Sequence, residues 1–204
     1  MTVRKTTNII VAGVGGQGNR TLMKLIAHAA LAAHAEVCVL SSTSLGRLGG
    51  PIACHIRLGP AASATIPTGE ADILVALELN EALRALPMLR REALAFIYTH
   101  CRLPIIAGIN GMQYPPVDEI EKASMARGIT SIFVPQSLSA FTDTDAGQMQ
   151  TSANSIMLGV LCRYTGLFPR SLAEQALCQC FPDVAAKNLQ AFAIGWEYGE
   201  KLRE

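Results

Sequence analysis

The chain has 204 residues, which is enough for one large domain with a sizeable buried core, and we expect a single domain over residues 1–204. Seventeen Lys and Arg against 16 Asp and Glu give a formal net charge of +1, so the sequence shows no electrostatic footprint for nucleic acid. Charged residues make up only 16% and mean hydropathy is +0.30, so surplus apolar surface has to be covered. Because no run of about 18 uncharged apolar residues occurs, we expect that cover to be a partner protein and not a membrane.

The cysteine pattern argues against a metal centre in this chain. Six cysteines are scattered along the sequence without a C-x-x-C pair, at positions 38, 54, 101, 162, 178 and 180. This spacing predicts neither an iron-sulfur cluster nor a structural zinc site. The N-terminal residues have no signal-peptide layout, so a cytoplasmic location with reduced thiols is the simplest expectation.

Strand-like and helix-like segments alternate over the first two thirds of the chain. Apolar, β-branched runs predict strands at 9–12, 37–40, 52–58, 72–77, 95–98 and 132–134, with helices at 21–27 and 81–86 between them. We expect the 37–40 strand to be buried. After about residue 136 only helical segments follow, at 154–164, 171–180 and 184–199. The pattern predicts an α/β, Rossmann-like doubly wound fold, with a mostly parallel sheet over about 1–135, helices on both faces and a helical region over about 136–204.

A glycine turn follows the first predicted strand and opens the first predicted helix. Its G-x-G-x-x-G pattern is formed by Gly13, Gly15 and Gly18, with Gly16 and Gln17 between them. Such a turn lets the backbone approach an anion beside unpaired helix N–H groups, so these five residues are our candidate ligand-binding segment. The alternative is a tight turn that serves only helix–strand packing.

Two nucleotide-binding interpretations can be compared with this turn. A dinucleotide site normally has an acid at the end of the second strand, but Ser41–Ser44 stand there, and these hydroxyls together with Arg47 would suit an NADP phosphate instead. An independent NADP-binding reductase therefore stays open as an alternative. A P-loop is excluded, because Asn19 and Arg20 follow Gly18 where that motif has Lys and then Ser or Thr.

A second glycine-rich turn at 46–51 should lie at the same sheet edge as the first. Two such turns would flank one crevice, where open α/β sheets usually bind ligands. Arg47 is the strong anion donor of this crevice unless it is a solvated loop residue. Glu78, at the end of the 72–77 strand, either faces the crevice or acts as an acid at a helix N-terminus.

A complete catalytic apparatus is not recognisable. The histidines at 28, 34, 55 and 100 have no metal-ligand spacing, and no serine lies in a G-x-S-x-G elbow. We therefore predict no catalytic residue and no metal ligand in this chain.

An ordered set of segments resembles the gamma-type subunit or domain of 2-oxoacid:ferredoxin oxidoreductases. The set comprises the turn at 13–18, the glycine pair 49–50, and the segments 71–78, 81–86, 154–159 and 188–192. Tyr114-Pro115 and the closing 188–195 segment are most similar to the smaller, beta subunit of the indolepyruvate-type enzyme. The resemblance extends over nearly the whole chain.

This resemblance implies an auxiliary subunit that is inactive alone. Thiamine diphosphate and iron-sulfur clusters would belong to a larger partner subunit, which passes electrons to ferredoxin, and this chain would bind no cofactor itself. The resemblance also implies that the glycine crevice positions coenzyme A or substrate; a pure assembly module and a homo-oligomer that hides the apolar surface are the alternatives. The family commonly has Glu-x-His-Gly and Gln-Arg before its paired glycines, whereas residues 41–48 here read Ser-Ser-Thr-Ser-Leu-Gly-Arg-Leu, which leaves the 2-oxoacid unidentified.

Overall fold

The computed structural model describes residues 6–42, 50–100, 114–141 and 146–203. Its strands are β1 (Thr7–Val14), β2 (Val37–Ser41), β3 (Pro51–Leu58), β4 (Ala71–Ala76), β5 (Leu89–Tyr98) and β6 (Thr130–Val134). Its helices are α1 (Asn19–Ala32), α2 (Leu79–Ala85), α4 (Val117–Ala126), α5 (Ala146–Thr165), α6 (Arg170–Cys180) and α7 (Ala185–Lys201). Short 3₁₀ turns follow α2 at Leu86–Met88, β6 at Gln136–Phe141 and α6 at Pro182–Val184.

The strands form one six-stranded sheet in the order β2-β3-β1-β4-β5-β6. β1, β4, β5 and β6 pair in parallel, whereas β3 is antiparallel to both of its neighbours, β1 and β2. The mostly parallel sheet is therefore confirmed. The prediction that residues 37–40 form a buried strand is wrong, since β2 lies at the sheet edge and Val39 and Leu40 are 42% and 43% exposed.

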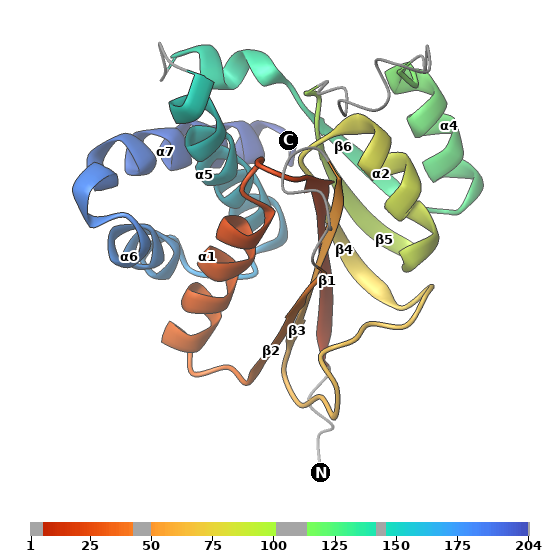
Figure 1. Cartoon of the computed structure of the whole chain (residues 1–204), viewed down its shortest axis with the longest axis horizontal. Helices are drawn as coiled ribbons and strands as arrows, with labels where there is room; N and C mark the ends of the chain where they lie inside the picture. Colours follow the sequence, from red (N-terminus) through yellow and green to blue (C-terminus); the bar gives the residue numbers. More distant parts are fainter. Residues whose placement is uncertain (1–5, 43–49, 101–113, 142–145, 204) are drawn as a thin grey trace.

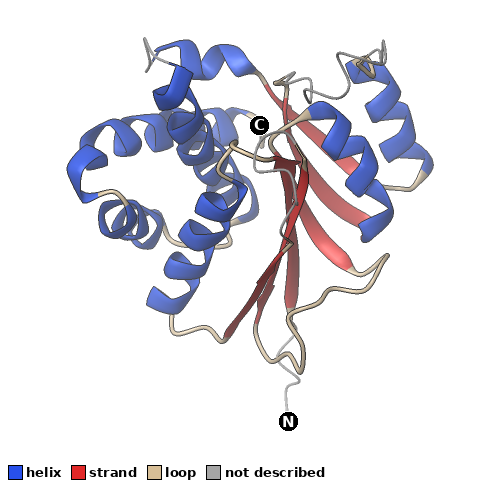
Figure 2. Cartoon of the chain, viewed as in Figure 1, coloured by secondary structure: helices blue, strands red, loops and turns tan. Residues whose placement is uncertain are grey.

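Helices cover the two faces of the sheet unequally (Figures 1 and 2). α1, α5, α6 and α7 pack on one face around a core that includes Ile9, Val11 and Phe96. α2 and α4 lie on the other face over a smaller core that includes Ile10, Leu74 and Ile97. Alternate residues of β1 thus enter opposite cores, which is the pattern of a strand buried on both faces.

Two glycines allow α5 and α7 to cross at very short range. A Cβ at Gly195 of α7 would overlap the carbonyl oxygen of Ile156 and lie 2.8 Å from its Cα atom. A Cβ at Gly159 of α5 would overlap the carbonyl oxygen of Phe192 in the same way. Beside this crossing, Ser155 donates a hydrogen bond of 2.7 Å to Oδ1 of Asn188. The α5 and α7 segments that carry the family resemblance are therefore those where these helices touch.

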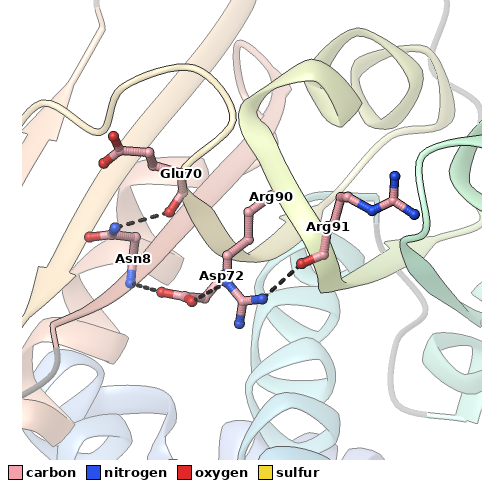
Figure 3. Close-up of polar contacts among 5 residues, drawn as sticks. All are labelled: Asn8, Glu70, Asp72, Arg90 and Arg91. Atoms are coloured by element: carbon pink, nitrogen blue, oxygen red, sulfur yellow. Dashed lines mark hydrogen bonds and ion pairs between the residues drawn. The ribbon is translucent and has the colours of Figure 1, made fainter.

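At the opposite end of the strands, one carboxylate fixes the pairing of three strands (Figure 3). Asp72 accepts from the backbone N–H of Asn8 at 2.8 Å and from Nε of Arg90 at 2.7 Å. The Asn8 side chain donates in turn to the carbonyl oxygen of Glu70 at 3.0 Å. Asn8, Asp72 and Arg90 belong to β1, β4 and β5. This network therefore connects three neighbouring strands at the end of the sheet that is away from the glycine turn.

Candidate functional site

The glycine turn lies between the end of β1 and the start of α1, as predicted. Gly16 and Gly18 have φ angles of +92° and +78°, in the left-handed region that side chains with a Cβ rarely occupy. Gly13 meets a different need, because a Cβ there would lie 2.8 Å from Oε1 of Gln17 and closer still to Asn19. Gly16 and Gly18 are thus required by backbone conformation, and Gly13 by close packing.

Gln17 holds the turn against the sheet. Its side-chain oxygen accepts from the backbone N–H of Val14 at 2.9 Å, and its side-chain nitrogen donates to the carbonyl oxygen of Leu77 at 3.0 Å. The residue is only 4% exposed. Both ends of the amide are engaged inside the chain, so Gln17 shapes the turn and does not reach toward solvent.

Two buried asparagines lie behind the turn. Asn19 donates to the carbonyl oxygen of Val14 at 2.9 Å, and Asn154 of α5 donates to the carbonyl oxygen of Gln17 at 3.2 Å. These bonds fix the orientation of both amides, and neither side-chain oxygen has a hydrogen-bond partner among the described residues. Leaving a buried acceptor unpaired costs free energy. The two side-chain oxygens can therefore accept hydrogen bonds from a donor such as buried water.

The end of the second glycine-rich segment lies against the first turn. The backbone N–H of Gly15 donates to the carbonyl oxygen of Gly50 at 2.9 Å, which places the start of β3 directly against the first turn. Arg47, the predicted anion donor, lies outside the described residues. Next to the turn the structure instead has Arg20, an exposed residue of the first turn of α1, whose Nε donates to Oγ of Ser41 at 3.0 Å. In the sequence, Arg20 was considered only as a residue that excludes a P-loop. Its position two residues after Gly18 also indicates a positive charge at the start of this helix.

Glu78 adopts the second of its two predicted roles. It is fully buried and caps α2, because Oε2 accepts from the backbone N–H of Glu81 at 2.8 Å. Its other oxygen has no partner among the described residues. Burial and the neighbouring Glu78 raise the pKa of Glu81, whereas Arg84, 3.6 Å from it, acts in the opposite direction. Two buried acids therefore stand at the start of α2, close to the ends of β1 and β4.

The solvent-facing part of the turn is small and basic. Gly16 and Arg20 are exposed, whereas Gln17 and Asn19 are buried. Backbone N–H groups at the start of a 14-residue helix, with an arginine beside them, can bind a phosphate or carboxylate. Among the described residues no group of three or more His, Cys, Asp or Glu could hold a metal ion. The arrangement is suited to binding an anion.

A hollow of about 450 Å³ lies at the opposite end of the strands from the glycine turn, beside the network of Figure 3. It is bordered by Asp72 and Arg90, but these side chains are paired with each other at 2.7 Å. Asp72 and Arg90 therefore stabilise the sheet, and the glycine turn remains the stronger candidate for ligand binding.

Comparison with known proteins assigns the chain to a family. The sequence profile of the pyruvate ferredoxin/flavodoxin oxidoreductase family matches residues 8–198. The chain belongs to this family. The match includes every strand of the sheet almost completely, the glycine turn and most of α7, so the family resemblance inferred from the ordered segments is confirmed.

Two relatives match this chain over most of its length. The indolepyruvate oxidoreductase subunit IorB of Archaeoglobus fulgidus is 30% identical over 191 residues, covering 93% of both chains. The subunit of the same name from Methanothermobacter thermautotrophicus is 32% identical over 199 residues, covering 93% of this chain and 95% of that one.

Solved structures share the fold. The pyruvate oxidoreductase subunit PORC of Thermotoga maritima matches with a TM-score of 0.68 at 20% identity, covering 95% of this chain and 97% of that one. A chain of the 2-oxoglutarate:ferredoxin oxidoreductase of Magnetococcus marinus matches with a TM-score of 0.73 at 21% identity, covering 97% of this chain but only 32% of that one. The same fold thus occurs as a separate subunit and as one part of a longer chain. Among the described residues no helix has the length and apolar character needed to cross a membrane.

Proposed function

We propose that this chain is the smaller subunit of an indolepyruvate-type 2-oxoacid:ferredoxin oxidoreductase. The match to subunits of that name, at 93% coverage of both chains for the Archaeoglobus fulgidus relative, is the observation that carries the proposal. In this function a larger subunit bears the thiamine diphosphate and the iron-sulfur clusters, ferredoxin accepts the electrons, and the complex works in the cytoplasm. No observation favours an independent NADP-dependent reductase.

Within this function, the glycine turn contributes to the binding of coenzyme A. Backbone N–H groups at the start of α1 and the exposed guanidinium of Arg20 have the chemistry that a phosphate of coenzyme A requires. The Magnetococcus marinus enzyme, whose fold is shared, was solved with coenzyme A and succinyl-coenzyme A bound. A coenzyme with several phosphates is therefore the ligand class that best suits this surface.

Reconstitution tests the subunit assignment. The chain and the larger indolepyruvate oxidoreductase subunit of the same organism would be purified separately, and indolepyruvate-dependent reduction of ferredoxin would be measured for each alone and for the mixture. We expect activity only in the mixture, together with a stable complex in size-exclusion chromatography. Oxidation of indolepyruvate by this chain alone, or full activity of the larger subunit without it, would contradict the assignment.

A further inference from the structure

A buried asparagine fixes the direction of one peptide group in the glycine turn. Asn19 donates to the carbonyl oxygen of Val14 at 2.9 Å. The C=O and N–H groups of a planar trans peptide point in opposite directions, so this bond turns the N–H of Gly15 away from Asn19. That N–H donates to the carbonyl oxygen of Gly50 at 2.9 Å. The asparagine on one side of the peptide therefore decides which acceptor the N–H can reach on the other side.

Asn154 of α5 holds the peptide between Gln17 and Gly18 in the same way. Its Nδ2 atom donates to the carbonyl oxygen of Gln17 at 3.2 Å, so the N–H of Gly18 points away from this side chain. Gly18 is half-buried, and its N–H makes no hydrogen bond to any described residue. Whereas the N–H of Gly15 is used inside the chain, the N–H of Gly18 can therefore donate to a ligand.

Asn154 also fixes the conformation of Gly18. The φ angle of this glycine is +78°, in the left-handed region. A Cβ at Gly18 would overlap Nδ2 of Asn154 and lie 3.4 Å from its Cγ atom, so the amide takes the place that a side chain would need. The peptide before Gly18 is thus held by a hydrogen bond on its carbonyl and by packing on the following Cα atom.

The environment of Asn154 indicates that its amide nitrogen has a function. The residue is 2% exposed, and its Oδ1 atom has no hydrogen-bond partner among the described residues. An unpaired buried acceptor costs free energy, and an alanine or a leucine at this position would avoid that cost. Local choices that cost stability are expected mainly at functional sites. The bond from Nδ2 to the turn is therefore the reason for an asparagine here.

The N–H of Gly18 lies where an anion is favoured. Gly18 directly precedes α1, and no side chain caps this helix. The first backbone bond of the helix runs from the N–H of Leu22 to the carbonyl oxygen of Gly18 at 2.9 Å, so the N–H groups of residues 19–21 have no partner within the helix. Together with the guanidinium of Arg20, these donors are suited to a phosphate.

We propose that Asn154 is a positioning residue for the anion site, which directs the N–H of Gly18 toward a phosphate of coenzyme A. The proposal rests on the proposed function, and it goes further because Asn154 acts through the Gln17–Gly18 peptide without touching the ligand. The same helix crosses α7 at Gly159, where a Cβ would overlap the carbonyl oxygen of Phe192. The packing of the C-terminal helices is thus connected to the geometry of the ligand site.

Two neighbouring residues of α5 give a matched test. Asn154→Ala removes the bond to the carbonyl oxygen of Gln17, and Ser155→Ala removes the 2.7 Å bond to Asn188. Each variant loses one buried hydrogen bond of the same helix, but only the first loses a contact with the turn. Both would be combined with the purified larger subunit, and kcat and the KM for coenzyme A would be measured with saturating indolepyruvate and ferredoxin. Thermal unfolding of each chain compares their stabilities.

We expect Asn154→Ala to raise the KM for coenzyme A about 10-fold and to change kcat less than about twofold, because a bond to a phosphate stabilises ground state and transition state alike. Ser155→Ala should leave both constants unchanged. Both variants should lower the melting temperature by about 2–10 °C, as expected for the loss of one buried hydrogen bond. If Asn154→Ala does not assemble, Asn154→Leu replaces it with the same expected result, since leucine fills the space of the amide without its donor.

The outcomes separate this proposal from the function on which it rests. If the wild-type mixture does not oxidise indolepyruvate, the proposed function itself is wrong and the proposal is wrong with it. If the mixture is active but Asn154→Ala has the KM of wild type, only the positioning role is wrong. An equal rise of the KM in Ser155→Ala would also overturn this role, because it would assign the effect to the packing of α5.

Discussion

The side-chain nitrogen of Gln17 donates to the carbonyl oxygen of Leu77 at 3.0 Å and so connects the glycine turn after β1 to the end of β4. The same side chain accepts from the backbone N–H of Val14 through its oxygen. Leu77 in turn donates its backbone N–H to the carbonyl oxygen of Ala12 at 2.8 Å. The edge of the sheet that presents the candidate anion site is therefore fixed by one buried amide. This explains why a glutamine is useful between Gly16 and Gly18 even if it touches no ligand.

Replacing Gln17 with Leu should destabilise the fold without changing the volume of the side chain greatly. The substitution leaves a buried N–H and a buried carbonyl without their partner, which costs about 2–4 kcal/mol in total. Urea unfolding followed by circular dichroism measures this loss. Gln190→Leu on the exposed surface of α7 is the matched control and should change stability by less than about 0.5 kcal/mol. Equal stability of the two variants would show that the Gln17 amide does not fix the turn.

The sequence predicted the sheet well because buried parallel strands have a strong apolar signal. The runs at 72–77 and 132–134 correspond to β4 and β6, and α6 and α7 begin and end within two residues of their predicted limits. The prediction of α5 is right at its end but wrong at its start, since the helix begins at residue 146 and not at 154. The direction of β3 could not be predicted, because it depends on which neighbours the strand finds and not on its own residues. The exposure of Val39 and Leu40 was missed for a similar reason, since the apolar composition of an edge strand does not distinguish it from a buried one.

The candidate site was predictable in its backbone but not in its side chains. The G-x-G-x-x-G spacing located the turn, and strand–turn–helix order placed the second glycine turn beside it, where Gly15 contacts Gly50. The roles of Gln17 and Glu78 depend on contacts with Leu77 and Glu81 that spacing alone does not specify. Asn154 is 137 residues away from the turn that it contacts, so only the packing of α5 reveals it.

Gly195→Ala should disrupt the packing of α5 against α7. The new Cβ would overlap the carbonyl oxygen of Ile156, and backbone atoms cannot move aside as a flexible side chain can. We expect a loss of about 3 kcal/mol or more, at the upper end of overpacking effects, although alanine favours helix formation by up to about 1 kcal/mol. Thermal unfolding measures the change.

Gly199→Ala in the same helix is the control for this variant. Its Cβ would lie 3.1 Å from its nearest neighbours, the Cβ of Arg163 and the carbonyl oxygen of Val160, so a small shift relieves the contact. The gain in helix propensity should offset most of the strain, which leaves the free energy of unfolding within about 1 kcal/mol of wild type. A similar loss in both variants would contradict the close crossing at Gly195.

Relative to wild type, Glu81→Gln should have a more favourable free energy of unfolding at pH 7 than at pH 4. Burial raises the pKa of Glu81 in the folded chain above its ordinary value of 4.5, so the protonated form fits the fold better than the ionised form. The stability that this residue contributes is present below the unfolded pKa and is lost as the pH rises through the folded pKa. Urea unfolding at both pH values measures the difference between variant and wild type. Glu121→Gln, at an exposed position of α4, is the control and should have little effect at either pH.

Thiol labelling of the native chain should distinguish buried from exposed cysteines. Burial raises the pKa of Cys162 to about 12 and also raises that of Cys54, so both should stay unreactive toward iodoacetamide at pH 8. Cys178 is exposed on α6 and should be alkylated. Mass spectrometry of peptides from native and urea-unfolded samples measures the modification. Rapid native labelling of Cys162 would mean that α5 is not packed as described.

Arg20→Met tests whether the glycine turn binds coenzyme A in the assembled enzyme. If Arg20 contacts a phosphate of the coenzyme, its loss removes a charge-assisted bond that contributes equally to the ground state and to the transition state. The KM for coenzyme A should then rise about 10-fold, equivalent to about 1.4 kcal/mol, while kcat changes little. Arg127→Met, at an exposed position after α4, should leave both constants unchanged. Because Arg20 is exposed and its partner Ser41 is a surface residue, the variant should fold normally, so an unchanged KM would mean that coenzyme A does not contact this turn through Arg20.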